Sequence, residues 1–162
     1  MTAQQVPGRV DPQVAQDIAE RSAAALWAGD AASRGLGMEI VEAAPGRSQV
    51  QMAVREDMVN GHGTGHGGLT FALADSAFAV ACNSYNRSTV AAACEIRFLA
   101  PTRLGDVLVA TAVERSREGR DGVYDVTVRC GDRVVAEFLG RSREIRGRLF
   151  EDEPQPASDP GS

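Results

Sequence analysis

The sequence predicts an α+β domain in which an antiparallel sheet wraps around one long, apolar helix. Its 162 residues have the length of one ordinary domain. Apolar spacing predicts a helix, two strands, a long central helix and then four strands. In the central run from Leu69 to Cys82 the only polar side chains are Thr70, Asp75 and Ser76. A helix that is apolar on nearly every side must be buried. The short links after it predict that the later strands are antiparallel neighbours.

The segment before the central helix reads as a helix followed by a hairpin. Asp11-Pro12 is typical of a helix start, and the stripe that follows predicts a helix to about Gly29. After a connection over residues 29–35, two alternating sets flank a Pro45-Gly46 turn: Leu36, Met38 and Ile40, then Val50, Met52 and Val54.

Four strands are predicted after the central helix: 89–99, 107–117, 123–130 and 133–143. We therefore expect a loose N-terminus at residues 1–10, a single domain at 11–146 and a disordered, acidic, proline-rich tail at 147–162. One curved sheet around one helix leaves an edge strand uncovered. This favours a dimer in which two sheets join edge to edge.

Composition excludes several classes of function. The net charge of −5 argues against general nucleic-acid binding. The central helix is too short for a bilayer and holds an acid at its centre, so no membrane partner is expected. All 17 basic residues are arginine, which excludes a Schiff-base lysine and a lysine-bearing phosphate loop. The first residues do not resemble a secretory signal. The three cysteines (Cys82, Cys94 and Cys130) form no CxxC pattern, so we expect them to be small core residues of a protein in the reducing cytoplasm.

Asp75 is the strongest candidate for chemistry. An acid in an apolar helix is desolvated, which raises its pKa and its basicity. The stretch NGHGTGHGG just upstream leaves bare backbone amides at a helix start, where an oxyanion can be held. Together they indicate hydrolysis of an activated acyl group. The structural alternative is a core aspartate capped by the hydroxyl of Thr70 or Ser76.

Two further motifs in this loop are weak indications of a metal site and of a dinucleotide site. His62 and His66 are four residues apart but lie in a glycine-rich loop without a third histidine, so no metal site is predicted. Residues 63–68 match GxGxxG literally, yet no buried strand precedes them, which disfavours a dinucleotide site. No cofactor is expected.

The segment NGHGTGHGGLTFALADSAFAVACNS, with HGG opening a helix and an acid nine positions after that histidine, resembles the hotdog-fold thioesterases. The likeness is greatest to the PaaI-like subfamily of phenylacetate degradation, and EIRFLAPTRLGDVL resembles a second segment of these proteins. The likeness spans about residues 11–146. It implies a hotdog fold, with an antiparallel sheet wrapped around a long central helix.

The resemblance also implies an activity and its residues. The substrate is an acyl-CoA thioester with an arylacetyl group, coenzyme A being part of the substrate. Asp75 is the nucleophile or the general base, and the Gly67 amide polarises the carbonyl. His66 and Gly68 line the site, and Asn60, fifteen positions before the acid, places water or substrate. The active form is a homodimer or homotetramer with active sites at the subunit interface.

Some assignments stay open on the sequence. Relatives that use a serine or threonine helper place it near Ala79 or Ala93, and this chain has alanine at both. An enoyl-thioester dehydratase or hydratase using His66 and Asp75 is one alternative function, and a non-catalytic acyl-CoA binding module is another. Arginines that could contact coenzyme A phosphates are Arg97, Arg103, Arg120, Arg141, Arg143, Arg146 and Arg148.

Overall fold

The structure is a computed structural model that describes residues 10–152. Its elements follow the predicted order, and the four late strands begin and end within two residues of the predicted bounds. They are α1 (Pro12–Gly29), α2 (Ala31–Gly35), β1 (Glu39–Ala44), β2 (Arg47–Ala53), a 3₁₀ turn (Glu56–Met58), α3 (Gly67–Cys82), β3 (Thr89–Phe98), β4 (Val107–Glu118), β5 (Asp121–Cys130) and β6 (Arg133–Glu144).

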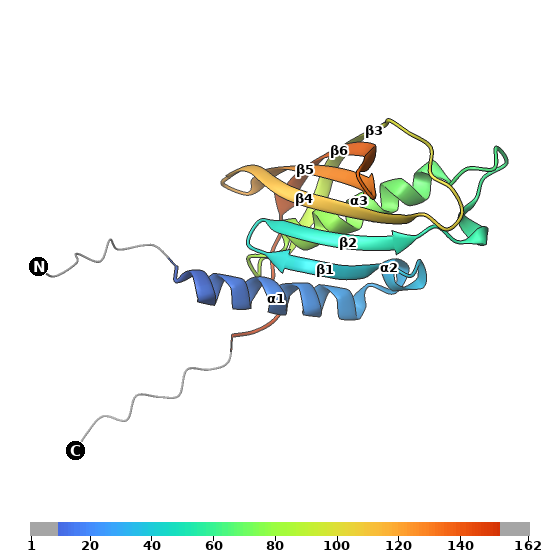
Figure 1. The fold of residues 1–162 in the computed structure, drawn as a ribbon. Helices are drawn as coiled ribbons and strands as arrows, with labels where there is room; N and C mark the ends of the chain where they lie inside the picture. Colours follow the sequence, from blue (N-terminus) through green and yellow to red (C-terminus); the bar gives the residue numbers. More distant parts are fainter. Residues whose placement is uncertain (1–9, 153–162) are drawn as a thin grey trace, which may run out of the picture.

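The six strands form one sheet in the order β1-β2-β4-β5-β6-β3, and every neighbouring pair is antiparallel. The sheet curves around α3, which contacts all six strands, while α1 runs along β1 outside the sheet (Figure 1). The predicted arrangement of an antiparallel sheet wrapped around the central helix is confirmed.

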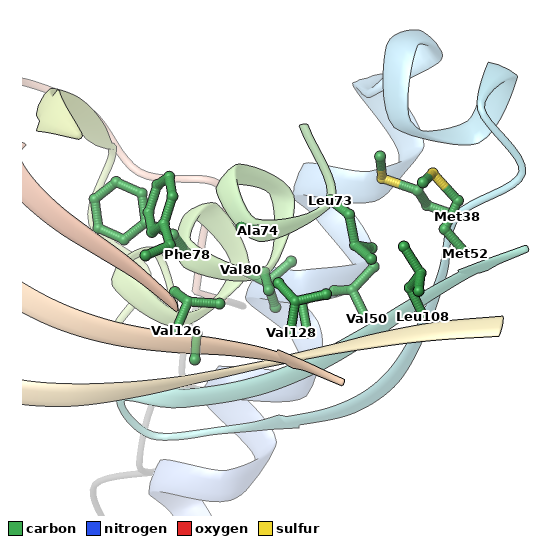
Figure 2. Close-up of a cluster of buried hydrophobic side chains, with 14 of the residues drawn as sticks. Met38, Val50, Met52, Leu73, Ala74, Phe78, Val80, Leu108, Val126 and Val128 are labelled. Carbon is green, nitrogen blue, oxygen red and sulfur yellow. The ribbon is translucent and has the colours of Figure 1, made fainter. Parts of the chain in front are cut away.

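The core lies between α3 and the concave face of the sheet (Figure 2). Leu73, Ala74 and Phe78 of α3 are fully or almost fully buried against alternating residues of the strands. A β-carbon added at Gly140 of β6 would lie 2.7 Å from the Phe78 ring, so the strand backbone contacts that ring directly. This close packing holds α3 in one position along the sheet, because a well-packed interior leaves little room for sliding.

The position of β3 differs from the prediction. Short links suggested that β3 would neighbour β4, but β3 pairs with β6 at the edge of the sheet, and β4 pairs with β2. The link between β3 and β4 instead passes the loop just before α3, where the Gly65 N–H donates to the Thr102 carbonyl at 2.8 Å. Because the sheet wraps around the helix, a short link can join strands that are far apart in the sheet.

The connection after α1 also differs from the prediction. Residues 29–35 contain α2, whose N-cap is Asp30: its side chain accepts a hydrogen bond from the Ser33 N–H at 2.9 Å. An aspartate cap satisfies an amide that would otherwise lack a partner, which is enough to start a short helix. Leu36 becomes the C-cap of α2, so β1 starts at Glu39 rather than at Leu36.

The structure describes the first six residues of the segment predicted as a disordered tail. Residues 147–152 lie against the domain, where the Asn86 side-chain carbonyl accepts hydrogen bonds from the N–H groups of Leu149 and Phe150 at 3.0 and 3.1 Å. The Arg21 guanidinium of α1 lies 4.1 Å from the centre of the Phe150 ring. Residues 153–162 of the predicted tail, and residues 1–9 of the predicted loose N-terminus, lie outside the described residues.

No helix in the described part of the chain is long and apolar enough to cross a membrane.

Candidate active site

The loop before α3 is organised by Asn60. Its side-chain carbonyl accepts hydrogen bonds from the backbone N–H groups of His62 and Thr64, at 2.9 and 3.2 Å. Its backbone N–H donates to the Thr64 carbonyl at 2.8 Å. These contacts fold residues 60–64 into a tight turn, so Asn60 shapes the loop that delivers the chain to the start of α3.

His66 caps α3. Its Nδ1 accepts a hydrogen bond from the Gly68 N–H at 2.9 Å, so this ring nitrogen carries no proton. The contact satisfies one of the amides that a helix start leaves without a partner. Gly68, predicted to line the substrate site, therefore offers no free N–H, although its backbone remains exposed.

The Gly67 amide stays free. Its N–H has no hydrogen-bond acceptor among the described residues. As the first residue of α3, Gly67 lies at the end of the helix where partial positive charge collects. A β-carbon at this position would lie 3.1 Å from the ring of Phe98, a side chain that is 56% exposed. The free N–H is thus positioned beside an aromatic surface and can stabilise a developing oxyanion.

Asp75 lies further along α3, half-buried against β3. Desolvation by burial raises the pKa of its carboxyl, and the negative charge of Asp30 raises it further. The nearest polar contact is the Cys94 thiol, whose Sγ lies 4.0 Å from Asp75 Oδ1. The structural alternative required a hydroxyl cap, and within residues 10–152 neither Thr70 nor Ser76 makes a hydrogen bond to Asp75.

The predicted residues form two groups in one chain. Asn60, His66, Gly67 and Gly68 meet at the start of α3, while Asp75 is eight residues further along the same helix. At the usual rise per residue, that spacing places Gly67 and Asp75 about 12 Å apart along the axis. Both could contact one small carbonyl group only if they were within about 3 Å of it. One chain therefore does not bring the two groups together.

Residues 62–137 match the thioesterase superfamily. The acyl-coenzyme A thioesterase PaaI of Escherichia coli (strain K12) is 43% identical to this chain over 130 residues, which cover 80% of this chain and 93% of PaaI. The chain belongs to the thioesterase superfamily.

Solved structures agree with this membership. The E. coli PaaI protein from the phenylacetic acid degradation operon matches this thioesterase-superfamily chain with a TM-score of 0.80 at 42% identity, covering 82% of this chain and 97% of that one. A mutant of PaaI from Thermus thermophilus matches with a TM-score of 0.68 at 37% identity, and the match covers 70% of this chain and 97% of that one. A Streptococcus mutans protein bound to acetyl CoA matches with a TM-score of 0.66 at 25% identity, and the match covers 68% of this chain and 90% of that one. The predicted hotdog fold is confirmed.

In this thioesterase-superfamily chain, a groove of about 670 Å³ lies between α1 and β1, away from Asp75, and is lined by Trp27 and Ile40 among others. A smaller hollow beside the helix start includes His66 and Leu69 but neither Gly67 nor Asp75. Among residues 10–152 no group of three or more potential metal ligands occurs.

Two neighbours of Asp75 are not indicated by the sequence analysis, which interprets Cys94 as a small core residue and places Asp30 in a connection. Cys94 reaches Asp75 because β3 turns this residue toward α3, and Asp30 does so because α2 folds back toward the helix. An N-cap signal at Asp30, followed by Ser33, is present in the sequence; nothing in the sequence pairs Cys94 with Asp75.

Proposed function

We propose that the protein is an acyl-CoA thioesterase that hydrolyses arylacetyl-CoA esters, such as phenylacetyl- and hydroxyphenylacetyl-CoA, to the free acid and coenzyme A. The observation that carries the proposal is that α3 holds both an N–H at Gly67 without an acceptor in the described residues and a half-buried carboxylate at Asp75. The similarity to E. coli PaaI, which bears the name acyl-coenzyme A thioesterase, supports the substrate class.

The proposed chemistry needs few groups, because a thioester carbonyl is electrophilic and a thiolate leaves readily. The Gly67 N–H stabilises the negative charge that develops on the carbonyl oxygen. Asp75 either removes a proton from an attacking water or attacks the carbonyl itself, forming an anhydride that water then hydrolyses. In both routes the C–S bond breaks, the thiolate of coenzyme A takes up a proton, and the acid is released.

The remaining predicted residues support the Gly67 amide in this proposal. Asn60 shapes the loop, and His66 accepts the Gly68 N–H, while the Gly67 N–H has no acceptor among the described residues. The side-chain N–H₂ of Asn60 has no acceptor within the described part of the chain and is therefore free to place water or substrate. No metal or redox cofactor takes part in the proposed reaction.

Thiol release tests the proposal. Purified protein is incubated with phenylacetyl-, hydroxyphenylacetyl-, benzoyl- and medium-chain acyl-CoA, and free thiol is measured over time. We expect the highest kcat/KM with the arylacetyl esters. An enoyl-CoA substrate is followed in parallel. Loss of the enoyl group without thiol release would favour the dehydratase or hydratase alternative, and tight binding without turnover would favour the binding module.

We further propose that the active site forms between two copies of the chain. The outer edge of β3 has no strand partner among the described residues, and the strand and its following link expose Val90, Phe98 and Leu99. An uncovered apolar edge strand is a ready site for pairing with a second chain. A partner α3 lying antiparallel would bring Gly67 of one copy toward Asp75 of the other, although the two groups are far apart along a single helix. The pairing of dimers into a tetramer, and a cytoplasmic location, stay predictions from the sequence.

Mixed dimers test the shared site. An Asp75→Asn chain and a Gly67→Pro chain, each inactive alone, are co-expressed with different tags. If each site takes Gly67 from one copy and Asp75 from the other, a mixed dimer contains one intact site. Random pairing should then restore about a quarter of the wild-type turnover. Recovery of no activity from isolated mixed dimers would place both groups of each site in one chain and contradict the proposal.

A further inference from the structure

A chain of short hydrogen bonds connects the start of α2 to α3 next to Asp75. Asp30 Oδ2 accepts a hydrogen bond from the Ser33 hydroxyl at 2.6 Å, and the two hydroxyl oxygens of Ser33 and Ser76 are 2.8 Å apart. The same Asp30 side chain accepts the Ser33 N–H at 2.9 Å as the N-cap of α2. Ser33 is buried, while Asp30 and Ser76 are half-buried, so the middle of this chain of contacts is shielded from solvent. It ends on the residue that directly follows Asp75.

The charges around Asp75 give this connection an electrostatic consequence. Desolvation raises the pKa of Asp75 first, and the like charge of Asp30 adds to that effect. The other titratable groups that interact with Asp75 are the thiols of Cys94 on β3 and Cys82 on α3; burial raises the pKa of both thiols, and the charge of Asp75 raises it further. The Arg34 guanidinium donates to the backbone carbonyl of Asp30 at 3.3 Å, but within residues 10–152 no arginine forms an ion pair with the carboxylate of Asp75 or Asp30.

We propose that Asp30 is a positioning residue for the thioesterase reaction: its carboxylate, held by Ser33 against Ser76, fixes the Asp75 turn of α3 and makes Asp75 a stronger base or nucleophile. The inference rests on the proposed function. A second negative charge makes Asp75 harder to ionise, and a carboxylate that holds its proton more tightly is also more reactive once ionised. Through Asp30, the folding of α2 therefore affects the reactivity of the Asp75 carboxylate on α3.

Asp30→Asn tests the inference. Asparagine is as good an N-cap as aspartate, so α2 should stay folded while the charge is removed. Asp75 must be ionised to act, so kcat/KM falls on the acidic side of the pH profile. In Asp30→Asn we expect this acidic limb to move to lower pH, because Asp75 then loses its proton more easily. The plateau value of kcat should fall at the same time.

Asp11→Asn is the matched control. Asp11 is the N-cap of α1, where it accepts the Gln13 N–H at 2.7 Å, and it does not contact Asp75. The same substitution there removes one negative charge from a helix cap and should leave the acidic limb unchanged. An acidic limb that does not move in Asp30→Asn, or that moves equally in Asp11→Asn, would overturn the inference.

Ser33→Ala separates the charge from the hydroxyl link. This variant removes the contact to Ser76 but keeps the carboxylate of Asp30 and its backbone cap. We expect a smaller shift of the acidic limb than in Asp30→Asn, because the charge remains. An equal or larger shift would assign the effect to the hydroxyls and contradict the role of the Asp30 charge.

Carboxyl-carbon NMR gives a readout that needs no turnover. The Asp75 signal is assigned by its loss in Asp75→Asn and titrated in the wild-type protein and in Asp30→Asn. We expect a lower titration midpoint in Asp30→Asn. If the protein releases no thiol from any acyl-CoA, the proposed function fails while this titration still decides the inference. If thiol is released but the midpoint does not change, the inference alone fails.

Discussion

Asp75→Asn should lower kcat by about 10²–10⁴-fold, because the amide is neither a base nor a nucleophile at the position where one carboxylate acts. Asparagine keeps the shape of the side chain, so the loss would reflect the missing charge rather than altered packing. The measurement is thiol release from the best arylacetyl-CoA substrate at saturating concentration. KM should change little if Asp75 contributes mainly to the transition state.

The stability of this variant serves as its control. Folding raises the pKa of Asp75, so the folded chain binds that proton more tightly than the unfolded chain. The stabilising contribution of the group is present at low pH and is lost as the pH rises through the raised pKa. A neutral asparagine avoids this loss, so at neutral pH the Tm of the variant should equal or exceed the wild-type Tm.

The pH profile of the wild-type enzyme adds an independent check. Its kcat/KM should fall as the pH drops through the pKa of Asp75, with a midpoint above the range of an ordinary aspartate. An Asp75→Asn variant that keeps wild-type turnover on both aryl and aliphatic esters would show that another group performs the chemistry.

Gly67→Pro should lower kcat by about 10²–10³-fold, because proline removes the one N–H that is proposed to hold the oxyanion. The site suits this substitution for two reasons. Gly67 is the first residue of α3, where proline is favoured. His66 already has the extended backbone that a residue before proline requires, with φ −65° and ψ 126°. The helix should therefore form normally, and circular dichroism would verify it.

Gly67→Ala is the matched control for the Phe98 contact. Alanine adds a β-carbon 3.1 Å from the Phe98 ring, as proline does, but keeps the N–H. We expect Gly67→Ala to retain most of the wild-type kcat. If alanine and proline reduce kcat equally, crowding against Phe98 explains the loss, and the oxyanion role of the amide is wrong.

Most of the fold could be predicted because its signals are local. The Asp11-Pro12 start of α1 and the apolar run of α3 follow from capping and periodicity within a few residues. The acid on α3 and the glycine turn before it stand out for the same reason, and together they indicate acyl hydrolysis. Among the described residues the Gly67 N–H has no acceptor, and burial raises the pKa of Asp75.

The failures share a physical cause. Which strand lies beside β3 depends on how one curved sheet accommodates all six strands, and β4 is paired with β2 on one side and β5 on the other. The contact between Cys94 and Asp75 joins residues nineteen positions apart, and the link from Ser33 to Ser76 joins residues forty-three apart. Neither pair has a spacing that local periodicity could detect.

The order of residues thus set the long buried helix, its lone carboxylate and the glycine-rich start, since each depends on neighbours within a turn or two. The tertiary structure decided what surrounds that carboxylate. Folding places the charge of Asp30 and the thiol of Cys94 near it. Charge interactions and side-chain contacts depend on distance in space rather than on separation along the sequence. Only the folded chain therefore reveals which groups can act together.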